Sequence, residues 1–180
     1  MARAAGLRGA TIARHLAAAS AGPPARAASA PVSGESFIHK AEREGSVASL
    51  LGAFTSTDTR FDRLLKGLAV SRVDEERGEV ECVMPVDEAC TNAFGTLHGG
   101  MTATLVDVVG TLALLTRDSG RPGVSVEIST SYVAAVKEGD SVRCVGRVTK
   151  HGRRLGFTQV DIFRVSDGKL AASGRHTKAL

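Results

Sequence analysis

The sequence contains no tryptophan and one tyrosine, and aromatic residues make up only 4% of its 180 residues. It also lacks any run of 18 apolar residues, so no membrane-spanning helix is predicted. Hydrophobic residues nevertheless reach 43%. This length and composition predict one folded domain with an aliphatic core, preceded by a tail.

Cysteine is scarce as well. The chain has three cysteines, and this odd number, with no pair at metal-ligand spacing, argues against a disulfide framework or a zinc site. Cys82 and Cys144 lie inside apolar strand patterns and are interpreted as small core residues. None of the five histidines forms a zinc motif with another histidine or a cysteine, so no metal is predicted.

Acidic residues and lysine are absent from residues 1–34, which contain four arginines (Arg3, Arg8, Arg14 and Arg26). Subtracting these from the 23 basic residues leaves 19, which equals the 19 acidic residues of the chain. The net charge of +4 therefore comes from the tail. A nucleic-acid-binding domain would concentrate positive charge in its fold, so no nucleic-acid partner is predicted.

The tail is typical of a transit peptide. It is rich in Ala and Ser, and residues 7–19 can form an amphipathic helix. Arg8 and Arg14 interrupt any apolar core that a secretory signal would need. We expect residues 1–34 to be a transit peptide and linker, disordered or cleaved, directing the protein to mitochondria or, as a second choice, to plastids. The alternative is a disordered tail without an address on a cytoplasmic protein.

The body of the chain begins with an expected N-terminal helical segment over residues 35–67. Two helical pieces are predicted there, one capped by Ser36 and the other running from Asp58 to Gly67. Residues 68–180 form the main predicted domain. It opens with a hairpin that turns at residues 75–78.

The C-terminal third of the chain predicts strands. After a loop at residues 118–123, four Val-, Thr-, Ile- and Phe-rich runs are separated by turn signals at residues 137–140, 150–153 and 166–168. We interpret them as an antiparallel meander, which brings the total to about six strands. The fold class is α+β, with the sheet wrapped around one long helix that begins near Gly100. Because this helix is apolar almost all round, it should be buried, and its remaining side predicts an oligomer.

Asp107 is the only ionisable residue between Gly99 and Thr116, about two turns into that helix. An unpaired buried charge costs about several kcal/mol, so such an acid is expected to have a partner or a catalytic task. The alternative places Asp107 on a thin polar stripe with Thr104, Val108 and Thr111.

Gly99 and Gly100 precede the helix and suggest an oxyanion hole. Backbone N–H groups in a first helical turn have no internal partner and point outward. Gly99 and Asp107 are eight residues apart, which corresponds to about 12 Å along a helix axis. One reacting atom cannot contact both, so we expect Gly99 of one copy to face Asp107 of another across a two-fold interface.

Three motifs resemble those of the hotdog-fold acyl-coenzyme A thioesterases of the phenylacetate-type superfamily. They are "TNAFGTLHGGMTATLVDVVGTLALL", "GRPGVSVEISTSYVAAVKEGD" and the terminal "GRHTKAL". The resemblance implies a hotdog fold, hydrolysis of fatty acyl-CoA to fatty acid and CoA without a metal or cofactor, and dimers that pair into tetramers.

The same resemblance implies roles for five residues. Asp107 activates water or attacks the thioester, and the Gly99 N–H stabilises the oxyanion. Asn92 and Ser125 assist, and His98 ranks below them as a catalytic or structural residue. CoA contacts are implied at Glu127, Tyr132, Val133, Ala134, Ala135, Val136, Lys137, Lys150, His151, Gly152, Arg153, Arg154 and Leu155. Ala179 stands where a basic residue or histidine would be expected to touch the ligand.

Two other functions remain open at this point. A hotdog enoyl-CoA hydratase or dehydratase would use a His and an acid, here His98 and Asp107, to move a proton beside a thioester carbonyl. A non-catalytic acyl-CoA-binding module would bind the thioester without releasing the thiol. The basic cluster of residues 150–154 would, without the resemblance, be read as a solvated hairpin tip.

Overall fold

The computed structural model describes residues 47–48, 51–52 and 60–180. The predicted caps Ser36 and Asp58, and most of the first predicted helical piece, lie outside this range. The second piece appears as a short 3-10 helix, η2 (Phe61–Leu65), which starts after Arg60. Its Leu65 is fully buried. Helical structure at this point was predicted, but the element is shorter than the sequence pattern indicated.

The predicted hairpin is confirmed as strands β1 (Ala69–Asp74) and β2 (Glu79–Pro85). Gly78 closes its turn with a φ of 67°, a left-handed conformation that favours glycine. A short 3-10 helix, η3 (Glu88–Cys90), and a loop then lead to the central helix α4 (Gly99–Leu115). The helix therefore begins within one residue of its predicted start.

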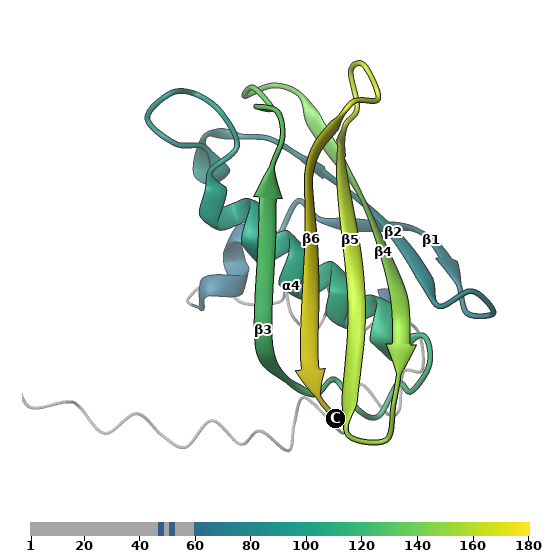
Figure 1. Cartoon of the computed structure of the whole chain (residues 1–180). Coiled ribbons are helices and arrows are strands. Elements are labelled where there is room, and N and C mark those ends of the chain that lie inside the picture. The colour runs from purple at the N-terminus through teal and green to yellow at the C-terminus, as the bar shows by residue number, and fades with distance from the viewer. Residues whose placement is uncertain (1–46, 49–50, 53–59) are drawn as a thin grey trace, which may run out of the picture. The chain divides into compact units, whose positions relative to one another are not determined.

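Four further strands follow α4, as predicted: β3 (Val124–Tyr132), β4 (Ser141–His151), β5 (Leu155–Arg164) and β6 (Leu170–Ala179). The sheet order is β1-β2-β4-β5-β6-β3, and every neighbouring pair is antiparallel. The predicted meander is correct for β4, β5 and β6 but wrong for β3, which pairs with β6 at the far edge (Figure 1).

The connection after β3 explains this difference. Leu97 donates its N–H to the Val136 carbonyl, and Thr96 bridges to Lys137. The chain that leaves β3 is thus held by the residues in front of α4 and does not fold back as a hairpin. The turn signal at residues 137–140 was correctly found, but it serves a crossover from one edge strand to an inner strand.

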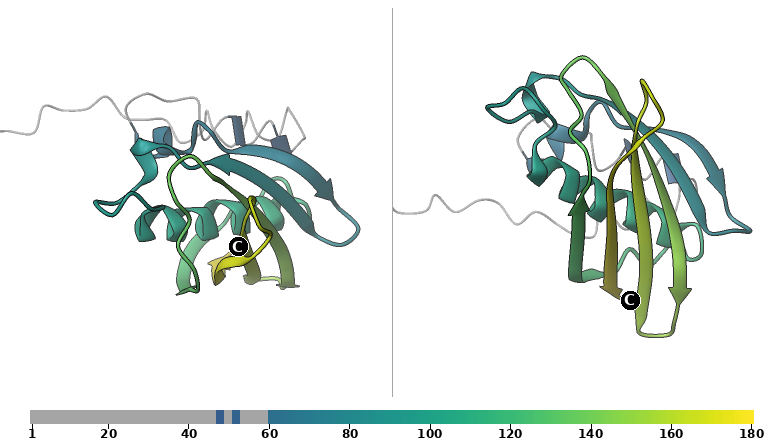
Figure 2. Two further views of the ribbon diagram at one scale, coloured as in Figure 1. Left: turned by 90° about the horizontal axis from the view of Figure 1, so that it is seen from above. Right: turned by 45° about the horizontal axis from the view of Figure 1, so that its top comes forward.

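The sheet curves around α4, as the two further views show (Figure 2). The helix packs against β2, β3, β4, β5 and β6. Its buried side chains, including Leu105, Val109 and Leu112, meet the inward residues of the sheet. Cys82 and Cys144 face each other across β2 and β4, and burial raises the pKa of both thiols. Their interpretation as core residues is confirmed.

One stripe of α4 is left open in the single chain. Ala103, Thr104, Asp107 and Val108 are only partly buried, whereas the rest of the helix from Met101 to Leu115 is buried. The neighbouring edge strand β3 is also exposed, with Val124 at 74% and Val126 at 61%. The helix is therefore covered on the sheet side and not all round. Within the residues described, no helix is long and apolar enough to cross a membrane.

Candidate active site

The start of α4 is fixed by His98. Its backbone is extended, and its Nδ1 accepts a hydrogen bond from the Gly100 N–H at 2.8 Å, so His98 is the N-cap of the helix. The His98 N–H in turn donates to the Cys90 carbonyl at 2.9 Å. Among the described residues the Gly99 N–H has no acceptor. It therefore remains free to bind an oxyanion at the positive end of the helix.

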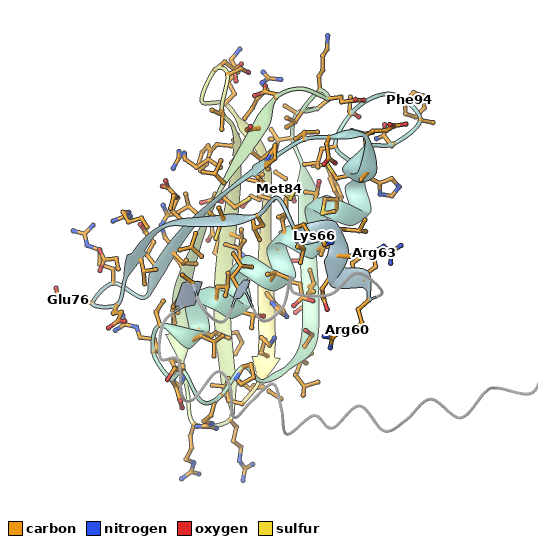
Figure 3. The ribbon with its side chains drawn as sticks, turned by 180° about the vertical axis from the view of Figure 1, so that it is seen from behind. Arg60, Arg63, Lys66, Glu76, Met84 and Phe94 are labelled. Atoms are coloured by element: carbon orange, nitrogen blue, oxygen red, sulfur yellow. The ribbon has the colours of Figure 1, made fainter. Side chains whose placement is uncertain are left out.

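Asn92 shapes the loop in front of this helix start. Its Oδ1 accepts from the Phe94 N–H at 2.9 Å and from the Thr96 hydroxyl at 3.2 Å. Phe94 lies on the loop between these contacts and is 89% exposed (Figure 3). Because the side-chain oxygen is engaged in the loop, the Asn92 NH₂ group, a donor, is the part that can serve a ligand.

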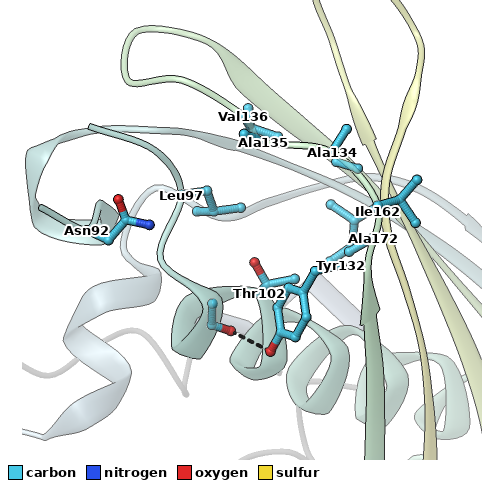
Figure 4. A pocket seen from close by; sticks show the side chains of 12 residues that line it. Asn92, Leu97, Thr102, Tyr132, Ala134, Ala135, Val136, Ile162 and Ala172 are labelled. Atoms are coloured by element: carbon cyan, nitrogen blue, oxygen red, sulfur yellow. Dashed lines mark hydrogen bonds between the residues drawn. The ribbon is translucent and has the colours of Figure 1, made fainter. Parts of the chain in front are cut away.

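Asn92 and Gly99 line one cavity of about 370 Å³ (Figure 4). Tyr132 stands at this cavity and donates its hydroxyl hydrogen to the Gly99 carbonyl at 3.1 Å. The remaining wall is mostly apolar: Leu97, Val133, Ala134, Ala135, Val136, Ile162, Ala171 and Ala172, together with Thr102. The cavity thus combines polar donors near the helix start with an apolar interior, which suits an acyl or pantetheine chain.

Asp107 lies about two turns further along α4, on the open stripe, with its side chain 41% exposed. Ser125 from β3 places its Oγ 3.4 Å from Asp107 Oδ1. His176 from β6 places its Nε2 2.9 Å from Ser125 Oγ and 3.6 Å from Asp107 Oδ1. Three elements therefore bring one carboxylate, one hydroxyl and one imidazole together.

A β-bulge directs Ser125 to this cluster. Ser125 pairs with Lys178 and Ile128 pairs with His176, while the register shifts between Ser125 and Glu127. Without the shift, strict alternation would turn Ser125 to the face opposite Ile128. The extra residue, Val126, keeps both side chains on the helix side, and bulges are frequent beside active sites for this reason.

His176 and Lys178 are site residues that sequence reasoning missed. Both are buried, with His176 1% and Lys178 5% exposed. The Lys178 ammonium donates to Thr111 Oγ1 at 2.7 Å, and Thr111 donates to the Asp107 carbonyl at 2.8 Å. The signal that could have found them is the alternation in β6, where Gly174, His176 and Lys178 occupy the inward positions.

Space for the His176 ring comes from Gly110 of α4. A Cβ at Gly110 would lie 2.7 Å from Thr158 Oγ1 and 3.4 Å from His176 Nδ1. A side chain there would push the helix away from β5 and β6. The glycine thus lets α4 approach the strands closely enough for Asp107 to reach Ser125.

A single copy of the chain does not bring all the predicted catalytic residues close together. The Asn92, Gly99 and Tyr132 group lies at the N-terminal end of α4, whereas the Asp107 and Ser125 pair lies about 12 Å along the axis. His98 caps the helix and does not join Asp107. The arrangement agrees with the predicted spacing of the two groups.

The residues predicted to contact CoA also fall into two separate regions of the chain. Tyr132 to Val136 line the cavity beside Gly99. Lys150 to Leu155 form the hairpin between β4 and β5, beside Ala179, which pairs with Leu155. Because β3 spans nine residues between these regions, they lie about 30 Å apart. Glu127 and Lys150 line a separate cavity of about 570 Å³ with Phe157 and Arg175.

The chain is similar to a known protein family and to several known sequences and structures. The thioesterase superfamily model matches residues 94–171. Human acyl-coenzyme A thioesterase 13 is 47% identical over 120 residues, covering 67% of this chain and 84% of the human protein. The zebra fish structure of thioesterase superfamily member 2 matches with a TM-score of 0.70 and 43% identity, covering 74% of this chain and 95% of that one. The mouse structure matches with a TM-score of 0.67 and 36% identity, covering 74% and 94%.

The buried Lys178 predicts a measurable pH dependence of stability. Burial lowers the pKa of Lys178, and the charge of Asp107 offsets only part of that effect. The unfolded chain therefore holds this proton more strongly than the folded one. Between the lowered pKa and the ordinary value of 10.5, unfolding takes up a proton, so folding stability rises with pH. We expect the free energy of unfolding of the wild type to rise relative to that of Lys178→Met from about pH 8 to about pH 10.

Urea denaturation at one fixed protein concentration measures this difference. Lys169→Met is the matched control, because the Lys169 side chain is 73% exposed and should show no such trend. A constant difference between wild type and Lys178→Met across this range would contradict the prediction.

Proposed function

Because the chain belongs to the thioesterase superfamily, we propose that it hydrolyses fatty acyl-CoA thioesters to the free fatty acid and CoA. Acyl-CoA thioesterase is the activity of its relatives, and the enzyme class is the same here. The observation that carries the proposal is the Asp107 carboxylate, partly open, with Ser125 Oγ 3.4 Å from it. The apolar walls of the cavity beside Gly99 support a fatty acyl substrate.

In the proposed reaction, Asp107 takes a proton from a water molecule whose oxygen attacks the thioester carbon. The carbonyl oxygen becomes an oxyanion and accepts a hydrogen bond from the Gly99 N–H. The C–S bond then breaks, and the CoA thiolate takes the proton that Asp107 held. The Asn92 NH₂ group is suited to donate to the thioester or the departing sulfur. In the alternative route the Asp107 carboxylate attacks the carbon itself, and the C–S bond breaks to release the CoA thiolate. Water then hydrolyses the resulting mixed anhydride to the fatty acid, which restores the Asp107 carboxylate and leaves a proton for the thiolate.

Two copies of the chain are required by this reaction. The open stripe of α4 and the exposed edge strand β3 lie next to each other, and both expose aliphatic side chains, including Val108, Val126 and Ile128. A two-fold axis beside this surface would run the two helices antiparallel and bring Gly99 of one copy to Asp107 of the other. We propose a homodimer through β3 and α4, and its pairing into a homotetramer.

Replacing Asp107 by Asn tests whether Asp107 is the catalytic base. We expect Asp107→Asn to lower kcat by orders of magnitude with an unchanged fold, because the amide is nearly isosteric but takes no proton. Thiol release from a panel of acyl-CoAs of increasing chain length should be measured for both proteins, which also gives the preferred acyl length.

Asp118→Asn is the control for this measurement. Asp118 follows the same helix, its side chain is 33% exposed, and its Oδ1 accepts the Gly120 N–H, a bond that Asn preserves. Wild-type rates in Asp107→Asn would exclude the mechanism. Water addition to an enoyl-CoA without thiol release would point to the hydratase alternative, and acyl-CoA binding without turnover would point to a binding module.

Gly99→Pro tests the oxyanion hole and the shared site together. Gly99 is the first helical residue, where proline is tolerated, and the extended backbone of His98 suits a following proline. The change removes the N–H, so we expect kcat to fall by about 10²- to 10³-fold. Coexpression of Gly99→Pro with Asp107→Asn should restore roughly a quarter of wild-type activity, because half of the randomly paired dimers have one intact site.

Each variant expressed alone is the baseline for this complementation. Circular dichroism of Gly99→Pro checks that the helix is intact. A coexpressed pair no more active than the single variants, with mixed dimers demonstrated by two affinity tags, would contradict a site shared between copies.

We also propose that the protein is mitochondrial. The proposal is supported by the four arginines and the absence of acidic residues in residues 1–34. A fluorescent protein fused after residue 34 should enter mitochondria, and the same fusion with these four arginines changed to alanine should not. Import of both fusions, or of neither, would contradict the proposal. A chain purified from mitochondria that still begins at Met1 would contradict processing.

A further inference from the structure

We propose that Arg164 is a positioning residue for substrate binding: its guanidinium group, held by Asp167, fixes the backbone of Ala135 and thereby one wall of the cavity beside Gly99. Its effect on turnover rests on the proposed function, in which this cavity receives part of the acyl-CoA. Arg164 does not line the cavity itself. It acts on the wall from behind.

The wall in question is an irregular connection. Residues 133–136 follow β3 on the crossover to β4 and line the cavity beside Gly99 (Figure 4). The first two N–H groups of this wall segment share one acceptor, the Ala171 carbonyl, at 2.8 and 3.0 Å. Its last carbonyl accepts from the Leu97 N–H at 2.8 Å. Ala135 lies between these contacts and is exposed, so its position depends on the bond that its own carbonyl makes.

Arg164, the last residue of β5, makes that bond. Its Nη1 donates to the Ala135 carbonyl at 2.9 Å. Its Nε and Nη2 donate to the two carboxylate oxygens of Asp167 at 2.9 and 2.5 Å. A planar guanidinium group held in this bidentate way can direct its remaining N–H groups along one line only. Ion pairs near the surface add little stability, so we assign to this pair the role of aiming the third donor at the wall.

The turn that carries Asp167 is fastened to the same crossover. Ser166 donates its hydroxyl hydrogen to Asp140 Oδ2 at 2.5 Å, and the Val165 N–H donates to the Ser141 carbonyl at 2.9 Å. Figure 1 shows the β5–β6 turn and the connection after β3 at the same end of the sheet. The donor and the wall are therefore held in one frame.

A second cavity, of about 400 Å³, lies on the other side of the wall. It is lined by Ala135, Lys137, Asp140, Arg164, Ser166 and Asp167. Ala135 lines this cavity as well as the one beside Gly99, so its backbone separates the two. Because there is open space behind the wall, the wall can retreat from a substrate unless Arg164 holds it.

The charges that this arrangement needs are present at physiological pH. The hydrogen bonds from Arg164 hold the pKa of Asp167 well below its usual range, and the same contact raises the pKa of Arg164. The Ser166 hydroxyl lowers the pKa of Asp140. Both carboxylates are therefore ionised and accept these hydrogen bonds when the enzyme is at work.

Arg164→Met tests the effect on binding. Methionine has no donor, so the Ala135 carbonyl loses its partner. We expect KM for acyl-CoA to rise about 10-fold while kcat stays within about 2-fold, because substrate must then order the wall as it binds. Arg147→Met is the matched control, since Arg147 pairs with Glu79 and Asp161, is 47% exposed and lines neither cavity. A fall in kcat with unchanged KM, or the same rise in KM in the control, would overturn the proposal.

A double-mutant cycle shows whether Asp167 acts through Arg164. Asp167→Ala releases the guanidinium group but keeps the donor, so we expect a smaller rise in KM, of about 3-fold. Adding Asp167→Ala to Arg164→Met should raise KM no further. Increases that multiply would overturn the proposal, because they would mean that the carboxylate affects binding without the arginine. Thermal unfolding of each variant excludes proteins that fail to fold.

The wall can also be observed without turnover. The chain has no tryptophan, and Tyr132, which directly precedes the wall segment and lines the same cavity, is its only tyrosine. Tyrosine emission of the full chain therefore reports on this one place. We expect the fast component of its anisotropy decay to grow in Arg164→Met and Asp167→Ala but not in Arg147→Met.

Equal anisotropy decays in the wild type and the three variants would overturn the proposal. A wild type that hydrolyses no acyl-CoA, but whose tyrosine emission changes as expected in the variants, would refute the proposed function and leave the positioning of the wall by Arg164 standing.

Discussion

The position of one carboxylate on a mostly buried helix is the constraint on which the rest of this structure depends. An ionised Asp107 in the core would cost about several kcal/mol, and Asp in a helix interior is itself unfavourable. The fold avoids this energetic cost by leaving one stripe of α4 uncovered, so that the Asp107 side chain stays 41% exposed in the single chain. The edge strand β3 next to this stripe is exposed as well in the single chain.

The polar groups behind Asp107 are organised around it. Ser125 contacts the carboxylate, His176 contacts Ser125, and Lys178 reaches Thr111 one turn away. All come from the last two strands of the sheet and from α4, so their distances are set by regular backbone and not by loops. Two small details of the backbone make the contacts possible: the bulge at Val126 and the glycine at position 110.

Much of the fold could be read from the sequence, because hydrophobic periodicity and turn residues act locally. The hairpin, the start of α4 and the four late strands were predicted on these grounds. The partner of β3 was not predicted, since a period of two shows which side chains share a face but not which strand lies alongside.

Asp107 and Gly99 could be recognised as candidate site residues from their residue types, an acid within an apolar helix and a glycine at its start. The role of Ser125 came only from resemblance, since alternation without the bulge turns it away. His176 and Lys178 were missed because polar residues in a terminal strand look solvent-exposed until the pairing is known.

The two-fold arrangement proposed for catalysis also bears on the predicted CoA contacts. Within one copy, the Lys150–Leu155 hairpin and residues Tyr132 to Val136 lie about 30 Å apart, beyond opposite ends of β3. If two β3 edges run antiparallel, the end of β3 near the hairpin in one copy lies beside the Tyr132 end in the other. The same axis that would bring Gly99 to Asp107 would therefore bring the basic hairpin to the cavity entrance, where guanidinium groups can meet phosphates. One symmetry operation would thus resolve two separations that a single chain leaves open, and this agreement supports the proposed dimer.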